Sequence, residues 1–600
     1  MSLVLGNKYP IPSQKIADAI TNSNSFPFFA IRSKNYVAKY ETNGKMEFIR
    51  IVSSYIEVVG KEVDFDNGNV RLLVRYNNGI ADIEQYFDRS ILTRQGLDQL
   101  TRLGVAFNTV SPSSFLTYLQ ATECSAPVSY THMQLGWGRY NDHTIFKSYK
   151  LYSDDDALAS TYSGTLDLQP HGDAEKWMAM YKDEVRGNVP LTIVLLSAFA
   201  SPLLGYLNQT HDIGSVLFNL CNVSSKGKTT AAMLAASVFG NPVMDKGTMI
   251  TFNATGNALI SFASQCNAHP IILDEAAIYD NPTDIRRQLY TLCSGRDKLR
   301  LNSNSELKDV RTFSSCIIST AEFNLVDESS PNGIKVRVFE LGDTFTKSAQ
   351  NSDAIKTTVM QNYGHAGKQF VEYIIKNKLN DIESDYAKVK TVILQNIAHK
   401  QELTERIVSK LAILVLAAHY CNCCFGWKIH LTKIIEYIRK LEMSVRRITD
   451  QKQYLLDCVA QEVGKNIQQF YCEETNNIYP TRCIGKLFKQ DDRQYVAIYS
   501  TTANDIFKRY SIENAENILK EVKKNGKLLT ETDRITKRIK INGQGTSQKC
   551  YVFDITEYEL VNDGKNAKNS LESSPARTVT RYMLDDAIAE FELEDDDEEL

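Results

Sequence analysis

No run of apolar residues in this 600-residue sequence approaches the length of about 18 needed to cross a bilayer. The longest, at 411–418, is bounded by Lys410 and His419. The N-terminus lacks the basic segment and apolar block of a secretory signal peptide. The twelve cysteines are scattered rather than arranged in a paired framework, which predicts reduced thiols. These absences predict a soluble, cytoplasmic protein without a membrane partner.

The chain also has little net charge, −4, but its charges are unevenly distributed. Residues 584–600 contain ten acidic side chains and no basic one, so the rest of the chain carries +6. Between 480 and 550 the sequence contains fifteen Lys and Arg residues but only eight Asp and Glu residues. This pattern favours a polyanion-binding module followed by a solvated acidic tail. A tail that is merely disordered fits the composition equally well.

A phosphate-binding loop is predicted after the apolar run at 215–220, where a turn of small residues leads through Gly-Lys-Thr into a helix at 231–239. Backbone N–H groups of such a turn bind phosphate, a lysine contacts the β- and γ-phosphates, and a hydroxyl holds Mg²⁺. The candidate nucleotide-binding residues are Asn222, Ser224, Ser225, Lys226, Gly227, Lys228, Thr229 and Thr230. Asn222 stands where the Walker A pattern has glycine, and asparagine tolerates the positive φ expected there. Taken alone, the motif could also be a chance Gly-Lys-Thr at a helix start.

Acidic residues follow a second apolar run, at 270–273. We expect Asp274 to hold Mg²⁺ through water and Glu275 to orient the attacking water, because metal binding and water activation are separate tasks. The acidic residues after this apolar run and the phosphate-binding loop together predict ATP hydrolysis. A third strand at 314–320 ends in Ser319 and Thr320, either of which is a candidate γ-phosphate sensor or a simple strand cap.

Two arginines are candidates for charge stabilisation at the phosphates. Arg337 is predicted to act across subunits as an arginine finger, since its guanidinium fork suits a transferred phosphoryl group. Arg406, at the start of a predicted helix at 407–420, is a weaker sensor candidate. An ordinary surface arginine is the alternative for Arg337.

Two basic segments are candidates for DNA binding. Alternating residues at 294–308 predict a β-hairpin, which in a central pore would grip single-stranded DNA, although a solvated surface hairpin fits as well. Helices at 503–510 and 512–525 and strands at 534–541 and 549–553 predict a winged helix, a module that binds duplex DNA or docks proteins. The candidate DNA-binding residues are Arg296, Lys298, Arg300 and Lys308 in the hairpin, and Lys520, Lys523, Lys524 and Lys527 in the winged helix.

These patterns predict an α/β protein of several domains. We expect an N-terminal α+β domain at 1–165, a P-loop ATPase core at 166–354, a helical lid at 355–448, a winged-helix domain at 449–561, and a linker with the acidic tail at 562–600.

Several stretches resemble one family. They lie at 135–137, 177–188, 197–204, 224–230, 235–242, 252–255, 273–275 and 363–367. The chain resembles the AAA+ helicases of mobile elements, in particular the self-loading, minichromosome-maintenance-like helicases of staphylococcal cassette chromosomes and pathogenicity islands. The resemblance covers about 60–420, and family members usually have glycine at position 222. It implies a hexameric ring that uses ATP and Mg²⁺ to translocate on single-stranded DNA, unwinds duplex DNA and recognises an origin through an end domain.

The sequence thus predicts an ATP-dependent helicase and replication initiator of a mobile genetic element. The N-terminal domain or the acidic tail could bind replication or regulatory proteins. One alternative is an ATP-switched DNA-binding regulator that oligomerises without unwinding, and another is a P-loop small-molecule kinase. The substitution Glu275→Gln distinguishes the helicase from the regulator, because the regulator keeps its activity in the ATP-bound state whereas the helicase stalls. The large lid, the hairpin and the basic end module argue against the kinase.

Overall fold

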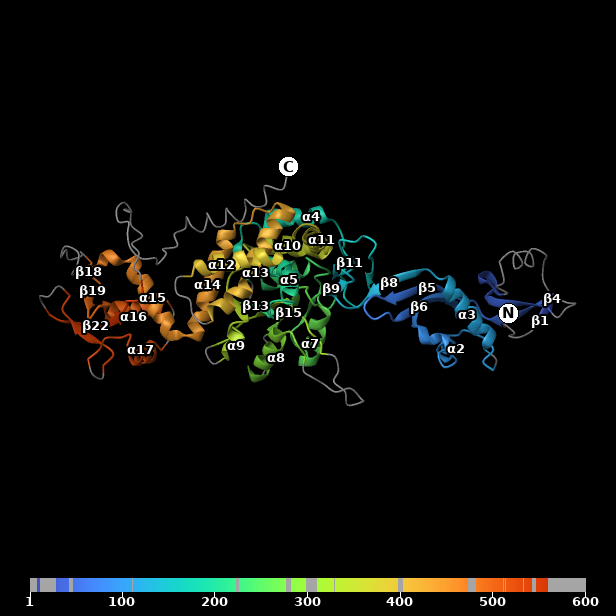
Figure 1. Cartoon of the computed structure of the whole chain (residues 1–600), viewed down its shortest axis with the longest axis horizontal. Helices are drawn as coiled ribbons and strands as arrows, with labels where there is room; N and C mark the ends of the chain where they lie inside the picture. The colour runs from blue at the N-terminus through green and yellow to red at the C-terminus, as the bar shows by residue number, and fades with distance from the viewer. Residues whose placement is uncertain are drawn as a thin grey trace. The chain divides into compact units, whose positions relative to one another are not determined.

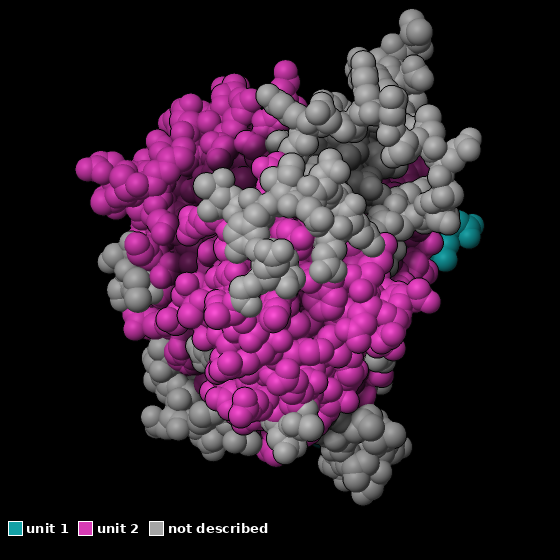
Figure 2. Space-filling model, turned by 90° about the vertical axis from the view of Figure 1, so that its left-hand side faces the viewer, with its two compact units in different colours: residues 1–169, 265–267, 371–377 teal, residues 170–264, 268–370, 378–600 magenta. Residues whose placement is uncertain are grey.

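The computed structural model describes residues 8–10, 28–42, 47–110, 112–222, 226–276, 282–297, 310–327, 330–397, 403–472, 482–510, 512, 514–531, 534–541 and 546–558. Figure 1 shows the elements of the chain, and contacts divide it into two compact units, coloured teal and magenta in Figure 2. Unit 1 comprises 1–169, 265–267 and 371–377, and unit 2 comprises the remaining residues. The finer division of unit 2 into core, lid and winged helix stays a prediction.

In its described residues, unit 1 consists mainly of antiparallel strands with two α-helices. Its largest sheet has the strand order β12-β8-β5-β6-β7, and two smaller sheets have the orders β1-β4-β3-β2 and β11-β10-β9. The elements are β1 (Lys8–Pro10), β2 (Phe28–Ile31), β3 (Tyr36–Thr42), β4 (Glu47–Ser53), β5 (Ile56–Asp64), β6 (Val70–Asn77), β7 (Asp82–Asp88), α2 (Leu97–Arg102), α3 (Ser113–Ser125), β8 (Val128–His132), β9 (Gly136–Tyr140), β10 (His143–Lys147), β11 (Leu151–Tyr152) and β12 (Thr161–Tyr162).

A five-stranded parallel sheet forms the centre of unit 2, with the order β14-β15-β16-β13-β17. Its strands are β13 (Val216–Cys221), β14 (Met249–Thr251), β15 (Ile271–Asp274), β16 (Cys316–Ala321) and β17 (Val338–Leu341). They are nearly all buried on both faces, as parallel strands covered by helices are. Because every pair is parallel, the carboxyl ends of β13, β15 and β16 meet at one edge, where ligands bind in such sheets.

Helices surround this sheet. Helix α5 packs against β16, α6 and α13, and α6 packs against β15 and β16. The helices are α4 (Ala174–Met180), α5 (Val189–Leu207), α6 (Lys228–Ala236), α7 (Gly256–Gln265), α8 (Pro282–Ser294), α9 (Asn332–Lys335), α10 (Ala349–Gln361), α11 (His365–Tyr373), α12 (Ile382–Gln395), α13 (Thr404–Phe425) and α14 (Leu431–Thr449).

Two helices among the described residues, α5 and α13, are long and apolar enough to cross a membrane by length and composition. The apolar run at 411–418 lies within α13, but polar residues interrupt both helices, so neither contains an uninterrupted apolar run of membrane length. In both, 78% of the apolar window is buried inside the fold, as in the core helix of a soluble protein. Phe199 of α5 contacts Phe425 of α13 with ring centroids 5.7 Å apart. Mutual burial therefore accounts for their composition.

Where the structure describes it, the C-terminal module, residues 450–558, combines three α-helices with a five-stranded sheet of order β18-β19-β20-β22-β21. The predicted helices and the two predicted strands after them are present, but the β19–β20 hairpin was not predicted. Its turn is made by Asp491 and Asp492, with φ of 50° and 59°, rather than by a Gly-containing pair. The elements are α15 (Gln451–Lys465), β18 (Phe470–Cys472), β19 (Gly485–Gln490), β20 (Arg493–Tyr499), α16 (Ser500–Arg509), α17 (Ala515–Lys524), β21 (Lys537–Ile539) and β22 (Gln548–Asp554).

Candidate functional site

The predicted phosphate loop connects β13 to α6, and its described part includes Asn222, Lys226 and Gly227. Gly227 has a φ of 79°, and a Cβ atom there would lie 2.5 Å from the Thr346 side chain, so only glycine fits. Helix α6 begins at Lys228, whose Nζ donates a hydrogen bond to the Asn222 carbonyl oxygen. Ser224 and Ser225 lie outside the described residues.

Asn222 lacks the positive φ that the sequence predicted, so backbone tolerance does not explain why asparagine occupies this position. Its side-chain amide donates instead to the carbonyl oxygens of Gly342 (2.9 Å) and Asp343 (3.2 Å). Glycine could not make these bonds. Asn222 therefore joins the loop to the segment that follows β17.

The acidic pair lies at the same edge of the sheet. Asp274 ends β15 and is 5% exposed, whereas Glu275 is exposed and has a φ of 61°. Thr320, on the neighbouring strand β16, connects the two: its Oγ1 donates to Asp274 Oδ1 (2.5 Å) and accepts from the Glu275 N–H (2.9 Å). Non-glycine residues in this backbone conformation are strained and persist only where the surroundings hold them, which is common at functional sites.

The structure separates the two sensor candidates. The Thr320 hydroxyl lies at the acidic pair, but the Ser319 hydroxyl donates to Asn219 Oδ1 (2.9 Å). Asn219 in turn donates to Glu340 Oε2 (2.6 Å), and this network does not line the cavity beside the phosphate loop. Adjacent residues of a strand point to opposite faces, so only one of the two could reach the site. Ser319 therefore lies in the core, and Thr320 is the sensor candidate that lies at the site.

A cavity of about 730 Å³ lies beside the loop and the acidic pair. One wall consists of Lys226, Gly227, Lys228, Thr229, Thr230, Glu275 and Thr320, all predicted from the sequence. A second wall was not predicted, and it comes from the segment after β17 and from α10: Thr344, Thr346, Lys347, Ser348, Ala349, Ser352, Asp353 and Lys356. Ala321 and Glu322, which follow Thr320, complete the lining. The two walls are joined by a hydrogen bond of 2.6 Å between the hydroxyls of Thr230 and Ser352.

Helix α10 is held in place at its N-terminus. The Ser348 side chain accepts from the Asn351 N–H (3.1 Å), and the Asn351 amide donates to Glu184 Oε2 (2.6 Å). Such a cap fixes the first turn of the helix. Lys347 and Lys356 add two cations to the cavity beyond the two of the phosphate loop. No local pattern marks them, since a lysine on an amphipathic helix resembles any solvated side chain.

Neither candidate arginine lines this cavity. Arg337 lies where β17 begins, at the other end of the sheet: its carbonyl oxygen accepts from the Leu217 N–H (2.9 Å), and its Nη1 donates to the Gly333 carbonyl (2.9 Å). Arg406 lies on α13 near the buried Lys410. Burial, with the charges of Arg337 and Arg406, lowers the pKa of Lys410 to about 8. Arg406 therefore does not line the cavity of its own chain, and its role as a sensor stays a prediction.

The predicted hairpin is described only at its base. Arg296 and Thr312 pair in an antiparallel bridge, and the Asp297 N–H donates to the Arg311 carbonyl (2.9 Å). Antiparallel arms entering 298–309 agree with the prediction. Lys298, Arg300 and Lys308 lie outside the described residues.

A groove of about 1040 Å³ lies between α17 and the strands β21 and β22 of the C-terminal module. Its basic residues are Lys520, Lys523, Lys524, Arg534, Lys537, Arg538 and Lys549. Three predicted lysines are ion-paired, Lys520 with Glu516 (3.1 Å), Lys524 with Glu521 (3.2 Å) and Lys527 with Glu557 (2.6 Å).

The cations of the strands differ from those of the helix. Lys537, Arg538 and Lys549 have no acidic partner among the described residues. A paired lysine must give up its partner to contact a phosphate, whereas these cations need not. They were not predicted from the sequence, because the ion pairs that distinguish the helix lysines from them become visible only in the fold.

Two known families match the chain. One is described as a domain of unknown function (DUF927) and matches residues 32–312, and the other is described as the Cch helix turn helix domain and matches residues 450–558. No curated protein matches.

Among solved structures, one titled "SCCmec type IV Cch - active helicase" is similar over 89% of this chain and 98% of that chain, with 23% identity and a TM-score of 0.59. This agrees with the resemblance to cassette-chromosome helicases. At this identity, the likeness shows that the chain has the fold of that helicase.

Proposed function

We propose that the protein is a DNA-stimulated ATPase and replicative helicase of the AAA+ class, which assembles as a hexameric ring and unwinds the origin of a mobile genetic element. The order of the central sheet supports the class, because β16 lies between the phosphate-loop strand β13 and the acidic strand β15. The fold likeness to a solved active helicase and the helix-turn-helix match support the activity. The observation that carries the proposal is the Thr320 hydroxyl joining Asp274 and Glu275 beside Lys228.

The residues around the cavity fit ATP with Mg²⁺. A volume of about 730 Å³ is typical of small-molecule sites, and the lining provides both lysines that could bind phosphates and carboxylates. Lys228 and the N-terminus of α6 would bind the phosphates, and Thr229 and Asp274 would hold the metal. Bound Mg²⁺ supplies charge neutralisation at the β- and γ-phosphates.

The chain's own groups would then carry out water activation. Glu275 is exposed at the cavity. The hydrogen bond from its backbone N–H to Thr320 fixes the backbone position from which its side chain extends. Positioning of the attacking water by this carboxylate is the step that Glu275→Gln removes. Asp274 stays buried, and its Oδ1 accepts a hydrogen bond from the Thr320 hydroxyl, which orients the carboxylate.

Ring assembly would complete the site. Arg337 lies at the end of the sheet opposite to the cavity of its own chain, so it acts only on the site of a neighbouring subunit. Arg406 lies near it and would face the same neighbour. Two guanidinium groups entering from the next subunit would stabilise charge on the transferred phosphoryl group.

DNA would be contacted at two places. The hairpin after Arg296 is proposed to hold single-stranded DNA in the ring, and the groove beside α17 to bind duplex DNA. In the groove we assign the phosphate contacts first to Lys537, Arg538 and Lys549, which have no acidic partner among the described residues. Unit 1 or the acidic tail would bind replication or regulatory proteins of the cytoplasm.

ATP hydrolysis and separation of a forked DNA, each measured with and without single-stranded DNA, test the proposal. The wild-type protein should hydrolyse ATP faster with DNA and separate the fork. Lys228→Ala should do neither, and Glu275→Gln should bind ATP without separating strands. ATP turnover without strand separation would refute the helicase and favour the ATP-switched regulator. Turnover indifferent to DNA would favour a small-molecule kinase.

A further inference from the structure

A continuous series of polar contacts runs from the phosphate loop to the C-terminal module. It begins at Asn222, whose amide binds the carbonyls of Gly342 and Asp343. Residues 342–346, named here the connecting segment, touch the loop again further on. The Phe345 N–H donates to the Lys226 carbonyl (2.9 Å), and Thr346 packs against Gly227. The connecting segment thus contacts the loop at both of its ends and cannot move independently of it.

The connecting segment is also bound to α14 through the side chain of Asp343. Tyr437 donates its hydroxyl to Asp343 Oδ2 (2.5 Å), and Lys440 donates to Oδ1 (3.2 Å). Burial, and then the neighbouring Asp343 carboxylate, raises the pKa of Tyr437, so its hydroxyl stays a donor. A donor aimed at a carboxylate forms a stronger bond than two neutral groups do. Asp343 therefore fixes the position of α14 relative to the phosphate loop.

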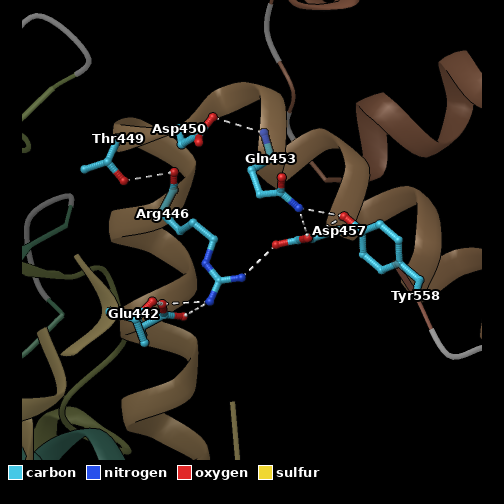
Figure 3. A network of polar contacts seen from close by, with 8 residues as sticks. Glu442, Arg446, Thr449, Asp450, Gln453, Asp457 and Tyr558 are labelled. Atoms are coloured by element: carbon cyan, nitrogen blue, oxygen red, sulfur yellow. Dashed lines mark hydrogen bonds and ion pairs between the residues drawn. The ribbon is translucent and has the colours of Figure 1, made fainter. Parts of the chain in front are cut away.

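Helix α14 leads directly into the C-terminal module. It ends at Thr449, α15 begins at Gln451, and Asp450 alone lies between them (Figure 3). The Asp450 side chain caps α15 by accepting from the Gln453 N–H (3.1 Å). With a single residue as the joint, a rotation of α14 changes the direction of α15 unless other contacts absorb it.

A buried ion network spans this joint (Figure 3). Arg446, 7% exposed, donates to both oxygens of Glu442 on its own helix (2.8 and 3.0 Å) and to Asp457 on α15 (2.7 Å). Buried charges of this kind fix one geometry, since removing a partner leaves a charge without compensation. Lys335, beside the start of β17, adds a bond from its Nζ to the Ile448 carbonyl (2.7 Å).

The far end of the network belongs to the C-terminal module itself. Tyr558, which follows the last strand, donates its hydroxyl to Asp457 Oδ1 (2.8 Å). Gln453 donates its amide to the same oxygen (2.9 Å) and to the Tyr558 hydroxyl (2.7 Å). The Asp457 carboxylate is therefore shared by α14, through Arg446, and by the end of the module that contains the basic groove.

We propose that the connecting segment and α14 couple the nucleotide state of the phosphate loop to the DNA affinity of the C-terminal module. The proposal rests on the proposed ATPase and DNA-binding function. Lys228 donates to the Asn222 carbonyl, and the phosphates of a bound nucleotide compete for that ammonium group. Release of the carbonyl lets Asn222 shift, and its amide bonds pass the shift to Asp343, α14 and the joint. Packed elements of this kind change between discrete arrangements rather than deform.

The coupling is measured with the full chain and a fluorescein-labelled duplex of mixed sequence, by fluorescence anisotropy with Mg-ADP and with a non-hydrolysable Mg-ATP analogue. Wild type should show DNA affinities that differ by about fivefold or more between the two nucleotides. Tyr437→Phe and Asp343→Asn should reduce this ratio to below about twofold, while nucleotide affinity changes less than about threefold. Arg439→Gln is the matched control: it removes an exposed cation of α14 that has no ion pair among the described residues and should keep the wild-type ratio.

The other end of the series is tested by Asn222→Gly, which restores the glycine usual in the loop and removes the amide bonds. It should lose the ratio when both nucleotides are present at saturating concentration, and its nucleotide affinity is measured in parallel to set that concentration. Reciprocity requires DNA to change the ratio of the two nucleotide affinities by the same factor, which gives a second readout. A wild-type ratio near one, or an unchanged ratio in Tyr437→Phe and Asn222→Gly, overturns the coupling. Wild type that binds no nucleotide refutes the proposed function instead.

Discussion

Replacing Thr320 with valine removes one hydroxyl from the centre of the candidate site and keeps the size and branching of the side chain. That hydroxyl donates to the buried carboxylate of Asp274 and accepts from the backbone N–H of Glu275. The variant leaves both groups without this partner. We predict that ATP binding survives, because neither bond involves the nucleotide, and that hydrolysis does not.

The magnitude follows from the two bonds and the backbone that they hold. A hydrogen bond to an ionised group contributes about 1.5–3 kcal/mol and a neutral one about 1 kcal/mol. Glu275, with its φ of 61°, relaxes once its N–H is released, because a non-glycine residue in this conformation is strained. A loss of about 2.5–4 kcal/mol in the transition state corresponds to a kcat lower by roughly 10²- to 10³-fold.

Thr320→Ser is the control, since it keeps the hydroxyl and loses only a methyl group. Phosphate release gives kcat, isothermal titration calorimetry gives nucleotide affinity, and thermal unfolding verifies that each variant is folded. Thr320→Ser should remain within about threefold of wild type and Thr320→Val should not. A folded Thr320→Val with wild-type turnover, or a Thr320→Ser that loses as much activity, refutes the role of this hydroxyl.

Three further outcomes are expected. Lys356→Gln should weaken ATP binding by about tenfold in calorimetry, because a cation leaves the cavity wall, whereas Thr357→Ala on the exposed side of α10 should leave it unchanged. Arg538→Gln should lower the slope of log affinity for DNA against log salt by about one, and Lys524→Gln, which removes an ion-paired lysine, by clearly less; equal slopes would contradict the groove assignment. Burial raises the pKa of Glu340 to about 7, so between pH 7 and the unfolded pKa of about 4.3 unfolding releases its proton. The contribution of Glu340 to stability therefore falls as the pH rises through that range. Glu340→Gln should flatten the corresponding part of the curve of melting temperature against pH.

The sequence predicted the part of the site that local pattern can encode. Lys228 lies in a strand–turn–helix motif and Asp274 ends an apolar strand, so both could be placed without a structure. Lys356 could not, since its approach to the cavity depends on how the chain turns back after β17. Asn222 was noticed but explained wrongly, because its partners lie 120 and 121 residues away in the sequence.

Helix α5 emerges from the ribosome long before the helix that buries it. It ends at Leu207 and packs against α13, which begins at Thr404. At a synthesis rate of about 5–20 residues per second, nearly 200 residues of delay leave its apolar surface uncovered for about 10–40 s. Unit 2 therefore cannot complete its core until α13 has been synthesised. Chains truncated before residue 404 should aggregate or be held by chaperones, and shortened versions of unit 2 for biochemical work should retain α13.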